Sequence, residues 1–299
     1  MYQHDLMAGQ RILVTGGGTG LGRAMAEGFL SLGADVAICG RRKSVCDETA
    51  GEWRARFPAR RIDTFGTDIR VAQDVENMIE ALWRTGGLTG LVNNAAGNFI
   101  ARTESLSPRA FDAVANIVFH GSFYVTQAVG KRWVAEAQSG AWRQGQPCRN
   151  VLSIIVTWVD NGSPYVVPSA MSKAGIEVMT KSLAVEWAKF GIRLNAVGPG
   201  LILTEGMAKR LYPGGDLGAR GADNPMSRTG TAAELQNLAA FLMAPGRCDW
   251  LTGQSIMMDG GNALATGGNF YELRSWKEED WQAAKQRIEE QNSKDKRQR

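Results

Sequence analysis

Residues 15–22 read TGGGTGLG and join a run rich in β-branched and aliphatic residues, Arg11–Thr15, to a stretch of helical period, Leu21–Leu32. Glycines at such a junction let the backbone turn sharply and approach a pyrophosphate, whose charge is met by free N–H groups and by the positive end of the helix. A glycine-rich turn that holds no ligand is the alternative, but a place in the first strand–helix unit favours a binding turn. The sequence therefore predicts a dinucleotide site that contains Gly16, Gly18, Thr19, Gly20 and Leu21.

The same alternation of short β-branched runs and longer helical stretches continues along most of the chain. We expect strands at Arg11–Thr15, Asp35–Cys39, Arg61–Thr67, Gly90–Asn93, Val151–Val156, Ile192–Val197 and Gln254–Met258. We expect helices between them, including Leu21–Leu32, Val71–Thr85, Pro108–Gln138, Met171–Phe190 and Ala232–Met243. Such alternation requires right-handed crossovers and a buried parallel sheet. The predicted fold class is therefore α/β, a doubly wound (Rossmann) parallel sheet of about seven strands in a single domain. We place this domain at residues 1–265 and a C-terminal helical extension at residues 266–299.

The composition excludes several classes of protein. The chain has 299 residues, 44% of them hydrophobic and 21% charged, so it can bury the core of one large domain. The net charge of +4 is modest, and we expect the basic tail to be a solvated end and not a nucleic-acid arm. Four scattered cysteines and two histidines indicate neither a metal site nor a disulfide framework. Without an apolar run of signal-peptide or membrane-spanning length, we expect a cytoplasmic protein that binds no membrane.

The end of the second predicted strand carries cations where an acidic residue would favour NADH. The chain reads Gly40-Arg41-Arg42-Lys43 at this position. A carboxylate there would accept hydrogen bonds from a ribose 2′-hydroxyl, whereas guanidinium groups can clamp a 2′-phosphate with charge-assisted bonds. The alternative is that Arg41 and Arg42 only begin a solvated helix. The sequence thus predicts NADPH as the cofactor, with Arg41 and Arg42 as its ligands.

The spacing Thr-Gly-x-x-x-Gly-x-Gly at 15–22 resembles the fingerprint of the short-chain dehydrogenase/reductase family, and other motifs follow in the family's order from about residue 10 to residue 261. Asp68 and Ile69 follow the third predicted strand, where the family contacts the adenine. The motif at 93–97, NNAAG, resembles the family segment beside the adenosine ribose and implies that Asn94, Ala95, Ala96 and Gly97 bind cofactor. The segment PGLI at 199–202 resembles the one that seats the nicotinamide carboxamide, and it implies roles for Pro199, Gly200, Ile202 and Thr204.

The catalytic segment departs from the commonest family pattern. Lys173 stands in the place of the family lysine, but four residues earlier the chain has Ser169 where most members have a tyrosine. The hydroxyl nearest to the usual upstream serine is Thr157. Because a serine hydroxyl is a very poor proton donor compared with a phenol, the ordinary tyrosine mechanism is excluded at that position.

One branch of the family that lacks this tyrosine is the 2,4-dienoyl-CoA reductases, and four stretches of the chain resemble theirs: 94–100, 165–175, 181–187 and 268–274. The resemblance implies that NADPH delivers hydride to the far end of a conjugated thioester and that an acid protonates the resulting dienolate. It also implies that Lys173 holds the cofactor ribose, and that Ser169 and Asn98 contact the nicotinamide or the thioester. The acid in that branch is a tyrosine fifteen positions before the lysine.

At that position this chain has Trp158, whose indole N–H can donate a hydrogen bond but cannot usefully give up a proton near neutral pH. The remaining acids are Tyr165 and a water near Lys173. Tyr165 is either the relocated acid, an aromatic wall of the pocket or a packing residue, and because it precedes Pro168 we expect it in an extended loop along the pocket edge. Trp158 is expected to shape the pocket or to bond a substrate oxygen, with a place in the core as the alternative.

Two more polar residues lie on the long helix predicted at Pro108–Gln138. Asn116 matches the family asparagine that bends this helix and holds a water for proton relay, and plain helix packing is the alternative. We expect His120 to be an interior or interface histidine.

Three functions remain open from the sequence. The leading one is an NADPH-dependent reductase of an unsaturated or keto acyl thioester, with a small-molecule substrate that can be a CoA thioester. The second is an alcohol or ketone oxidoreductase of the same family, and the third is an NADPH-binding sensor or assembly subunit with slow catalysis. The family resemblance also implies a homotetramer that packs through Pro108–Gln138 and Met171–Phe190.

Overall fold

The computed structural model describes residues 3–204, 221–265, 273 and 275–286. Its contacts divide the chain into two compact units, Met1–Gly260 and Gly261–Arg299, which we describe separately. In the first unit a parallel sheet of seven strands has the order β3-β2-β1-β4-β5-β6-β7. The strands are β1 (Arg11–Thr15), β2 (Asp35–Gly40), β3 (Ile62–Gly66), β4 (Gly90–Asn93), β5 (Arg149–Ile154), β6 (Ile192–Pro199) and β7 (Ser255–Met258). The predicted doubly wound α/β fold is confirmed.

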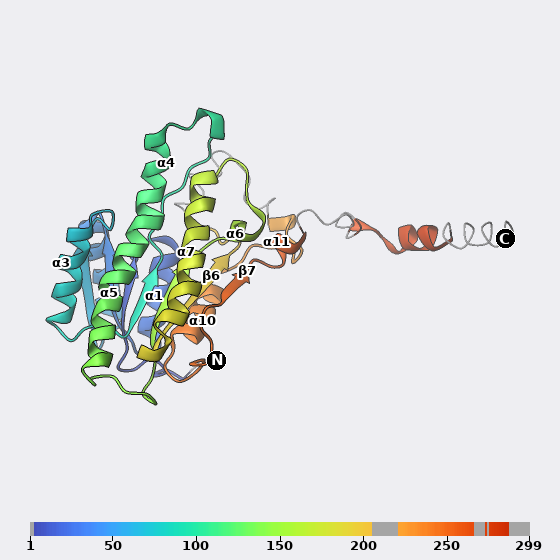
Figure 1. Cartoon of the computed structure of the whole chain (residues 1–299). Coiled ribbons are helices and arrows are strands. Elements are labelled where there is room, and N and C mark those ends of the chain that lie inside the picture. Colours follow the sequence, from blue (N-terminus) through green and yellow to red (C-terminus); the bar gives the residue numbers. More distant parts are fainter. Residues whose placement is uncertain (1–2, 205–220, 266–272, 274, 287–299) are drawn as a thin grey trace. The chain divides into compact units, whose positions relative to one another are not determined.

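Helices cover both faces of this sheet (Figure 1). On one face lie α1 (Gly20–Ser31), α2 (Lys43–Arg56) and α10 (Ala232–Met243). On the other lie α3 (Ala72–Trp83), α5 (Gly121–Gln138) and α7 (Val167–Glu186). The shorter helices of this unit are α4 (Pro108–Ala115), α6 (Trp158–Asn161), the 3₁₀ turns η1 (Thr103–Ser105) and η3 (Ala188–Phe190), and the π-helical turn η2 (Asn116–His120).

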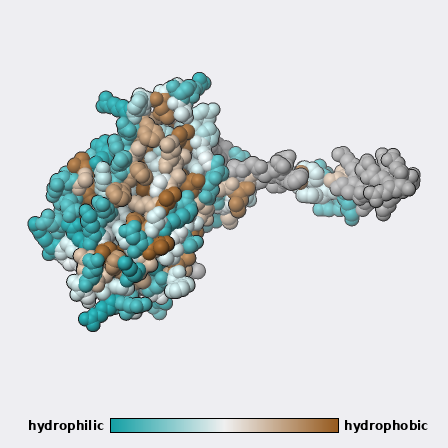
Figure 2. All heavy atoms as spheres, viewed as in Figure 1, coloured by the Kyte–Doolittle hydropathy of each residue, from teal (hydrophilic) through white to brown (hydrophobic). Residues whose placement is uncertain are grey.

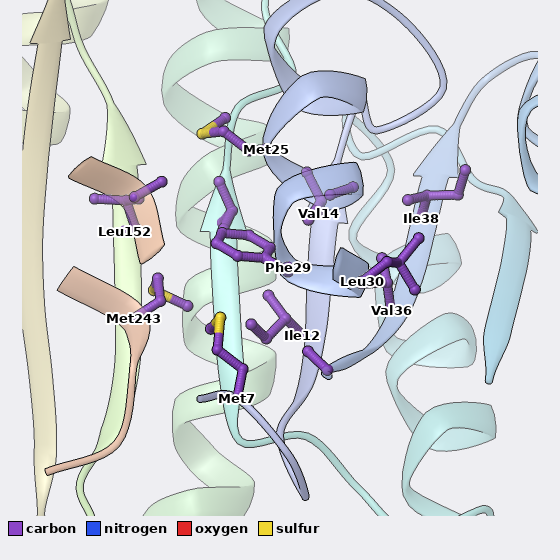
Figure 3. Packing of buried hydrophobic residues seen from close by; sticks show 14 of the residues in the cluster. Met7, Ile12, Val14, Met25, Phe29, Leu30, Val36, Ile38, Leu152 and Met243 are labelled. Carbon is purple, nitrogen blue, oxygen red and sulfur yellow. The ribbon is translucent and has the colours of Figure 1, made fainter. Parts of the chain in front are cut away.

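The two faces produce two hydrophobic cores because strand side chains alternate between them. In β1, Ile12 and Val14 belong to one buried cluster, whereas Leu13 belongs to the other. Figure 3 shows the first cluster, in which Phe29 of α1 packs beside Ile12. All five residues of β1 are buried, so the strand is fixed on both sides and holds the turn that follows it in place.

The strand order reverses between β1 and β4, which are adjacent and parallel in the sheet. In open α/β sheets, ligands bind outside the carboxyl ends of the strands at such a switch point. The glycine-rich turn follows β1 and the segment beginning at Asn94 follows β4, so both lie at this point.

Two predicted helices differ from the structure by more than two residues or by an interruption. The long helix expected at Pro108–Gln138 is interrupted by η2, where the backbone takes a π-helical turn at Asn116–His120. The helix expected from Met171 begins at Val167, because Pro168 occupies its first turn, where the missing N–H costs nothing. Ser169 and Lys173 therefore lie on the same helix, one turn apart.

In the second unit, α11 spans Asn262–Ala265 and residues 278–286 are helical. The indole rings of Trp276 and Trp281 meet edge to face with centroids 4.8 Å apart. Most of the extension expected at residues 266–299, including residues 266–272, 274 and 287–299, lies outside the described residues. Among the residues that the structure describes, no helix combines the length and the apolar character needed to cross a membrane.

Candidate active site

The glycine-rich turn is packed tightly against the segment after β4. The Thr15 hydroxyl accepts hydrogen bonds from the backbone N–H groups of Asn94 (2.9 Å) and Ala95 (3.0 Å). The Asn94 side-chain amide donates to the Thr15 carbonyl at 2.9 Å, and a Cβ on Gly22 would lie 2.3 Å from that amide nitrogen. Gly16 has φ +65°, and a Cβ there would lie 3.0 Å from Ala95 Cα. The glycines at 16 and 22 are therefore required by the fold of the site itself.

The start of α1 supplies the donors that a pyrophosphate needs. The helix begins at Gly20, its N-cap Thr19 makes no side-chain cap bond, and its first turn has no acidic residue. The first N–H groups of a helix have no partner within it, so those near Gly20 and Leu21 can bind an anion. Gly18 packs against Cys46 of α2, since a Cβ at Gly18 would lie 3.3 Å from that sulfur. These features fit a dinucleotide.

The adenosine side carries the cations expected for NADPH. Arg41 and Arg42 are exposed, and Arg42 occupies the N-cap position of α2 without a side-chain capping bond. Asp68 pairs with the Arg70 guanidinium, with the shortest contact at 2.5 Å, and this hydrogen bonding lowers the pKa of the Asp68 carboxyl below its ordinary value, with a smaller contribution from Arg41. The charge of the Asp68 carboxylate is thus compensated by Arg70. Within the described ranges, neither Arg41 nor Arg42 has an ion-pair partner, so both guanidinium groups can bind a phosphate. Ile69, next to Asp68, is buried.

The opposite half of the site follows β6. The N–H of Gly200 donates to the Met258 carbonyl at 2.9 Å, next to Pro199 at the end of the strand. Ile202 is buried and forms an isolated bridge with Gly230. Thr204 lies close to the glycine-rich turn: a Cβ added to Gly20 would be in van der Waals contact with the Thr204 side chain, at 3.9 Å. Thr204, which is expected beside the nicotinamide, therefore lies next to Gly20, which is expected beside the pyrophosphate.

Lys173 is a buried ammonium with a main-chain partner. Its Nζ donates to the carbonyl of Ile154 at the end of β5, and burial lowers its pKa from 10.5 to about 8. In the part of the chain that the structure describes, no carboxylate pairs with it. Ser169, one helical turn earlier, is also buried. Sequence reasoning missed the Ile154 carbonyl, because a main-chain acceptor has no residue signature.

Trp158 begins α6, directly beyond β5, and is half-buried. Its helix packs against α7, which carries Lys173. Trp158 is thus outside the fully buried core and near the end of the strand that receives Lys173. This placement leaves it available to shape a pocket, and its contact with a substrate stays a prediction.

Tyr165 does not lie in the extended loop that we expected. Its φ is +66°, in the left-handed region, and Val167 two residues later is already helical. The chain must reverse within this short loop to enter α7, so the tertiary connection overrides the local preference of residues before a proline. The Tyr165 carbonyl accepts a hydrogen bond from the Ala101 N–H at 2.9 Å. Its side chain is 59% exposed, and its phenol has no hydrogen-bond partner among the described residues.

The remaining candidates lie on the neighbouring segments. Asn98 is half-buried, and its side-chain oxygen accepts a bond from the Phe99 N–H at 2.9 Å. Asn116 is exposed and begins the π-helical turn, which packs near Gly97 through Ile117. His120 is exposed, which excludes the interior alternative and leaves the interface position as a prediction; its ring lies 5.4 Å from that of Phe119. The half-buried Ala95 and Gly97 and the exposed Ala96 complete the turn after β4.

Comparison with known proteins places this arrangement in a family. Residues 16–263 match the family model described as enoyl-(acyl carrier protein) reductase. The chain is 40% identical to a probable 2,4-dienoyl-CoA reductase of Caenorhabditis elegans, described as (3E)-enoyl-CoA-producing, over 92% of this chain and 88% of that protein. It is 37% identical to a probable (2E)-enoyl-CoA-producing 2,4-dienoyl-CoA reductase of Bacillus subtilis, over 86% of this chain and 98% of that protein.

A solved structure with a similar fold is a gluconate 5-dehydrogenase from Burkholderia cenocepacia in complex with NADP and tartrate, with a TM-score of 0.76 and 26% identity over 87% of this chain and 98% of that one. The glycine-rich turn, the segment after β4 and the helix with Lys173 all lie within the matched residues 16–263. The chain therefore belongs to the short-chain dehydrogenase/reductase family and, within it, to the branch that resembles the dienoyl-CoA reductases.

Proposed function

We propose that this protein is an NADPH-dependent reductase of unsaturated acyl-CoA thioesters of the 2,4-dienoyl type. The observation that carries the proposal is the helix α7, on which a buried Lys173 follows a buried Ser169 by one turn where most family members have a tyrosine. That arrangement accompanies the similarity to dienoyl-CoA reductases along nearly the whole chain. NADPH, when bound, supplies the hydride that is transferred to the far end of the conjugated system.

The residues of the chain have distinct roles in this proposal. Gly16, Gly18, Thr19, Gly20 and Leu21 hold the pyrophosphate, Arg41 and Arg42 pair with the 2′-phosphate, and Asp68 and Ile69 contact the adenine. Asn94, Ala95, Ala96 and Gly97 pass beside the adenosine ribose, and Pro199, Gly200, Ile202 and Thr204 seat the nicotinamide. Lys173 donates hydrogen bonds to the nicotinamide ribose, and Ser169 and Asn98 orient the nicotinamide or the thioester. Asn116 holds a water for the proton relay.

The proton has two candidate sources. Tyr165 is one, provided that its exposed phenol closes onto the substrate, and a water beside Lys173 is the other. The position of the acid decides the product. Protonation of the dienolate at the carbon next to the thioester leaves a 3-enoyl product, whereas protonation two carbons farther along leaves a 2-enoyl product. The two relatives named above differ in this respect, so product analysis of this protein reports directly on where its acid lies.

The proposal is tested by steady-state oxidation of NADPH with a 2,4-dienoyl-CoA, the matched 2-enoyl-CoA and a panel of ketones. We expect the dienoyl-CoA to have the highest kcat/KM. A preference for ketones would favour the alcohol or ketone oxidoreductase. Tight NADPH binding without turnover of any substrate would favour the sensor or assembly subunit.

We also propose that the protein is a homotetramer. Two separate apolar surfaces support this. The first combines Phe119 and Phe123 with Met171, Val178 and Val185 of α7, and the last two are 61% and 81% exposed. Figure 2 shows hydrophobic residues gathered over α5 and α7. To the second we assign two more exposed aromatic residues, Phe241 of α10 and the fully exposed Trp250.

Exposed apolar patches of this kind mark protein interfaces, and two different twofold interfaces on one subunit generate a tetramer. Light scattering should give four times the mass of the chain, and Val178→Asp should reduce it. A monomeric mass at micromolar concentration contradicts the proposal.

We also propose a cytoplasmic location. The four free cysteines support it, and cell fractionation tests it.

A further inference from the structure

Two backbone segments contact the proposed nicotinamide seat, residues 199–202. One is the turn after β7 at residues 258–260, and the other is the loop at residues 221–231. They are far apart in the sequence, so their mutual position depends on the contacts between them and not on local chain stiffness.

The seat rests directly on the turn after β7. Gly200 donates its N–H to the Met258 carbonyl at 2.9 Å, and a Cβ on Gly200 would lie only 2.7 Å from Asp259 Cα. This separation is too short for any side chain, so backbone packs on backbone. A displacement of Asp259 therefore displaces Gly200.

One side chain fastens that turn from the other side. The Asn224 amide donates to the Asp259 carbonyl at 2.7 Å, while its oxygen accepts the Met226 N–H at 2.9 Å. Gly260 has φ +66°, and a Cβ there would lie 2.5 Å from the Asn224 oxygen. The turn thus closes around the Asn224 side chain, and both ends of the amide are used.

The loop that carries Asn224 is anchored independently. Arg228 makes a bidentate ion pair with Glu234, at 2.7 and 3.0 Å, and Thr231 and Glu234 form a capping box at the start of α10. From this fixed base, Gly230 donates its N–H to the Leu201 carbonyl at 2.9 Å. The seat is therefore held from one side through Leu201 and from the other through Asp259.

We propose that Asn224 is a positioning residue, which holds the nicotinamide seat at the distance needed for hydride transfer by clamping the turn at Asp259 and Gly260. The inference rests on the proposed function, because it takes residues 199–202 to be the seat. Asn224 itself touches neither reacting atom in this scheme; it acts through Asp259 and Gly200.

The test compares Asn224→Ala and Asn224→Asp with the wild-type protein. The aspartate keeps the acceptor for Met226 but replaces the donor to Asp259 by a carboxylate oxygen, which repels the Asp259 carbonyl, so it opens the clamp while the local turn keeps its bond. NADPH affinity is measured by calorimetry, and hydride transfer by the primary isotope effect with NADPH deuterated at the transferred position. The half-buried bond is worth about 1 kcal/mol, and where that energy holds the seat in place for the cofactor its loss corresponds to a roughly five-fold higher Kd for NADPH. We expect that increase in both variants, a larger isotope effect, and an unchanged ratio of NADPH to NADH affinity, because Arg41 and Arg42 are untouched.

Asn195→Ala is the matched control. Asn195, in the middle of β6, donates to the Leu251 carbonyl at 2.8 Å and accepts the Gln254 N–H at 3.1 Å. It makes the same pair of bonds away from the seat, so its loss should lower thermal stability and leave NADPH affinity and the isotope effect unchanged.

Wild-type affinity and isotope effect in both Asn224 variants, or the same changes in Asn195→Ala, would overturn the proposal. The affinity measurement needs no substrate. A wild-type protein that binds NADPH but does not reduce dienoyl-CoA would therefore contradict the proposed function, while a weaker affinity in Asn224→Asp would still support the clamp.

Discussion

Replacing Lys173 by methionine should make the cofactor-free protein more stable and at the same time inactivate it. The side chain is almost completely buried on α7, and desolvation lowers its pKa from 10.5 to about 8. That difference corresponds to roughly 3 kcal/mol of free energy that the folded state loses by holding the ammonium charged. Methionine has a similar length and no charge. It leaves the Ile154 carbonyl without its donor, which costs about 1 kcal/mol. The expected net gain at pH 7 is therefore roughly 2 kcal/mol.

The gain should depend on pH in a defined direction. A base whose pKa is lower in the folded state binds fewer protons there than in the unfolded chain. Between pH 8 and pH 10.5 the unfolded chain holds the extra proton, so the stability of the wild-type protein rises with pH across this window relative to Lys173→Met. The advantage of the variant is thus complete below pH 8, falls as the pH rises, and becomes a deficit of about 1 kcal/mol, that of the lost Ile154 bond, by pH 10.5.

Urea unfolding at pH 7 and pH 9.5, without NADPH, measures both effects. Lys181→Met is the control: the exposed Lys181 lies two turns later on α7 and pairs at 2.6 Å with the buried Glu177, so the same substitution there should lower stability, opposite in sign to Lys173→Met. NADPH should stabilise the wild-type protein more than Lys173→Met, because the ammonium gains ribose hydrogen bonds. A Lys173→Met protein that is less stable than wild type at pH 7 would refute the reasoning, as would one that turns over substrate normally.

Three other results are expected. Removing both guanidinium groups with Arg41→Ala and Arg42→Ala should raise the Kd for NADPH at least tenfold and leave that for NADH unchanged, as checked by calorimetry. Tyr165→Phe should lower turnover by roughly 10²–10⁴ if the phenol is the acid, with little change in NADPH affinity, and by only a few-fold if the ring is a wall. Trp158→Tyr should raise dienoyl-CoA reductase activity, since it places a phenol fifteen residues before Lys173; unchanged or lower activity would count against the branch mechanism.

The parts of the fold that were predictable from sequence are those fixed by local pattern. β1 was placed at its observed bounds, because its five residues are buried on both faces and the glycines that follow cannot continue a strand. The parallel sheet and its two-sided helix cover followed from the alternation, since parallel strands require crossovers, whereas the strand order was not predicted. The break at Asn116 was expected only through family resemblance. Nothing in its sequence marks a π-helical turn, because it arises where the helix meets its neighbours.

The candidate site divides in the same way. The cofactor contacts that we propose for the glycines and for Arg41 and Arg42 were open to prediction, because backbone approach and 2′-phosphate binding each demand a residue type. The Asn224 clamp was not, since a lone asparagine in a loop has no periodic or motif signal and its partner is a carbonyl 35 residues away. Tyr165 shows the opposite failure. The local rule for residues before a proline predicted an extended backbone, and the entry into α7 imposed a left-handed one.

That left-handed residue bears on the question of the acid. A tyrosine at φ +66° is costly, by about 1–3 kcal/mol, and persists only where surrounding contacts fix it. The contact here is the bond from the Ala101 N–H to the Tyr165 carbonyl, which ties this loop to the segment that carries Asn98 three residues earlier. A glycine at 165 would relieve the strain and remove the ring together. Comparing Tyr165→Gly with Tyr165→Phe therefore separates the two contributions. If Tyr165→Gly is more stable but inactive while Tyr165→Phe is active, the aromatic ring shapes the pocket. The proton then comes from the water beside Lys173.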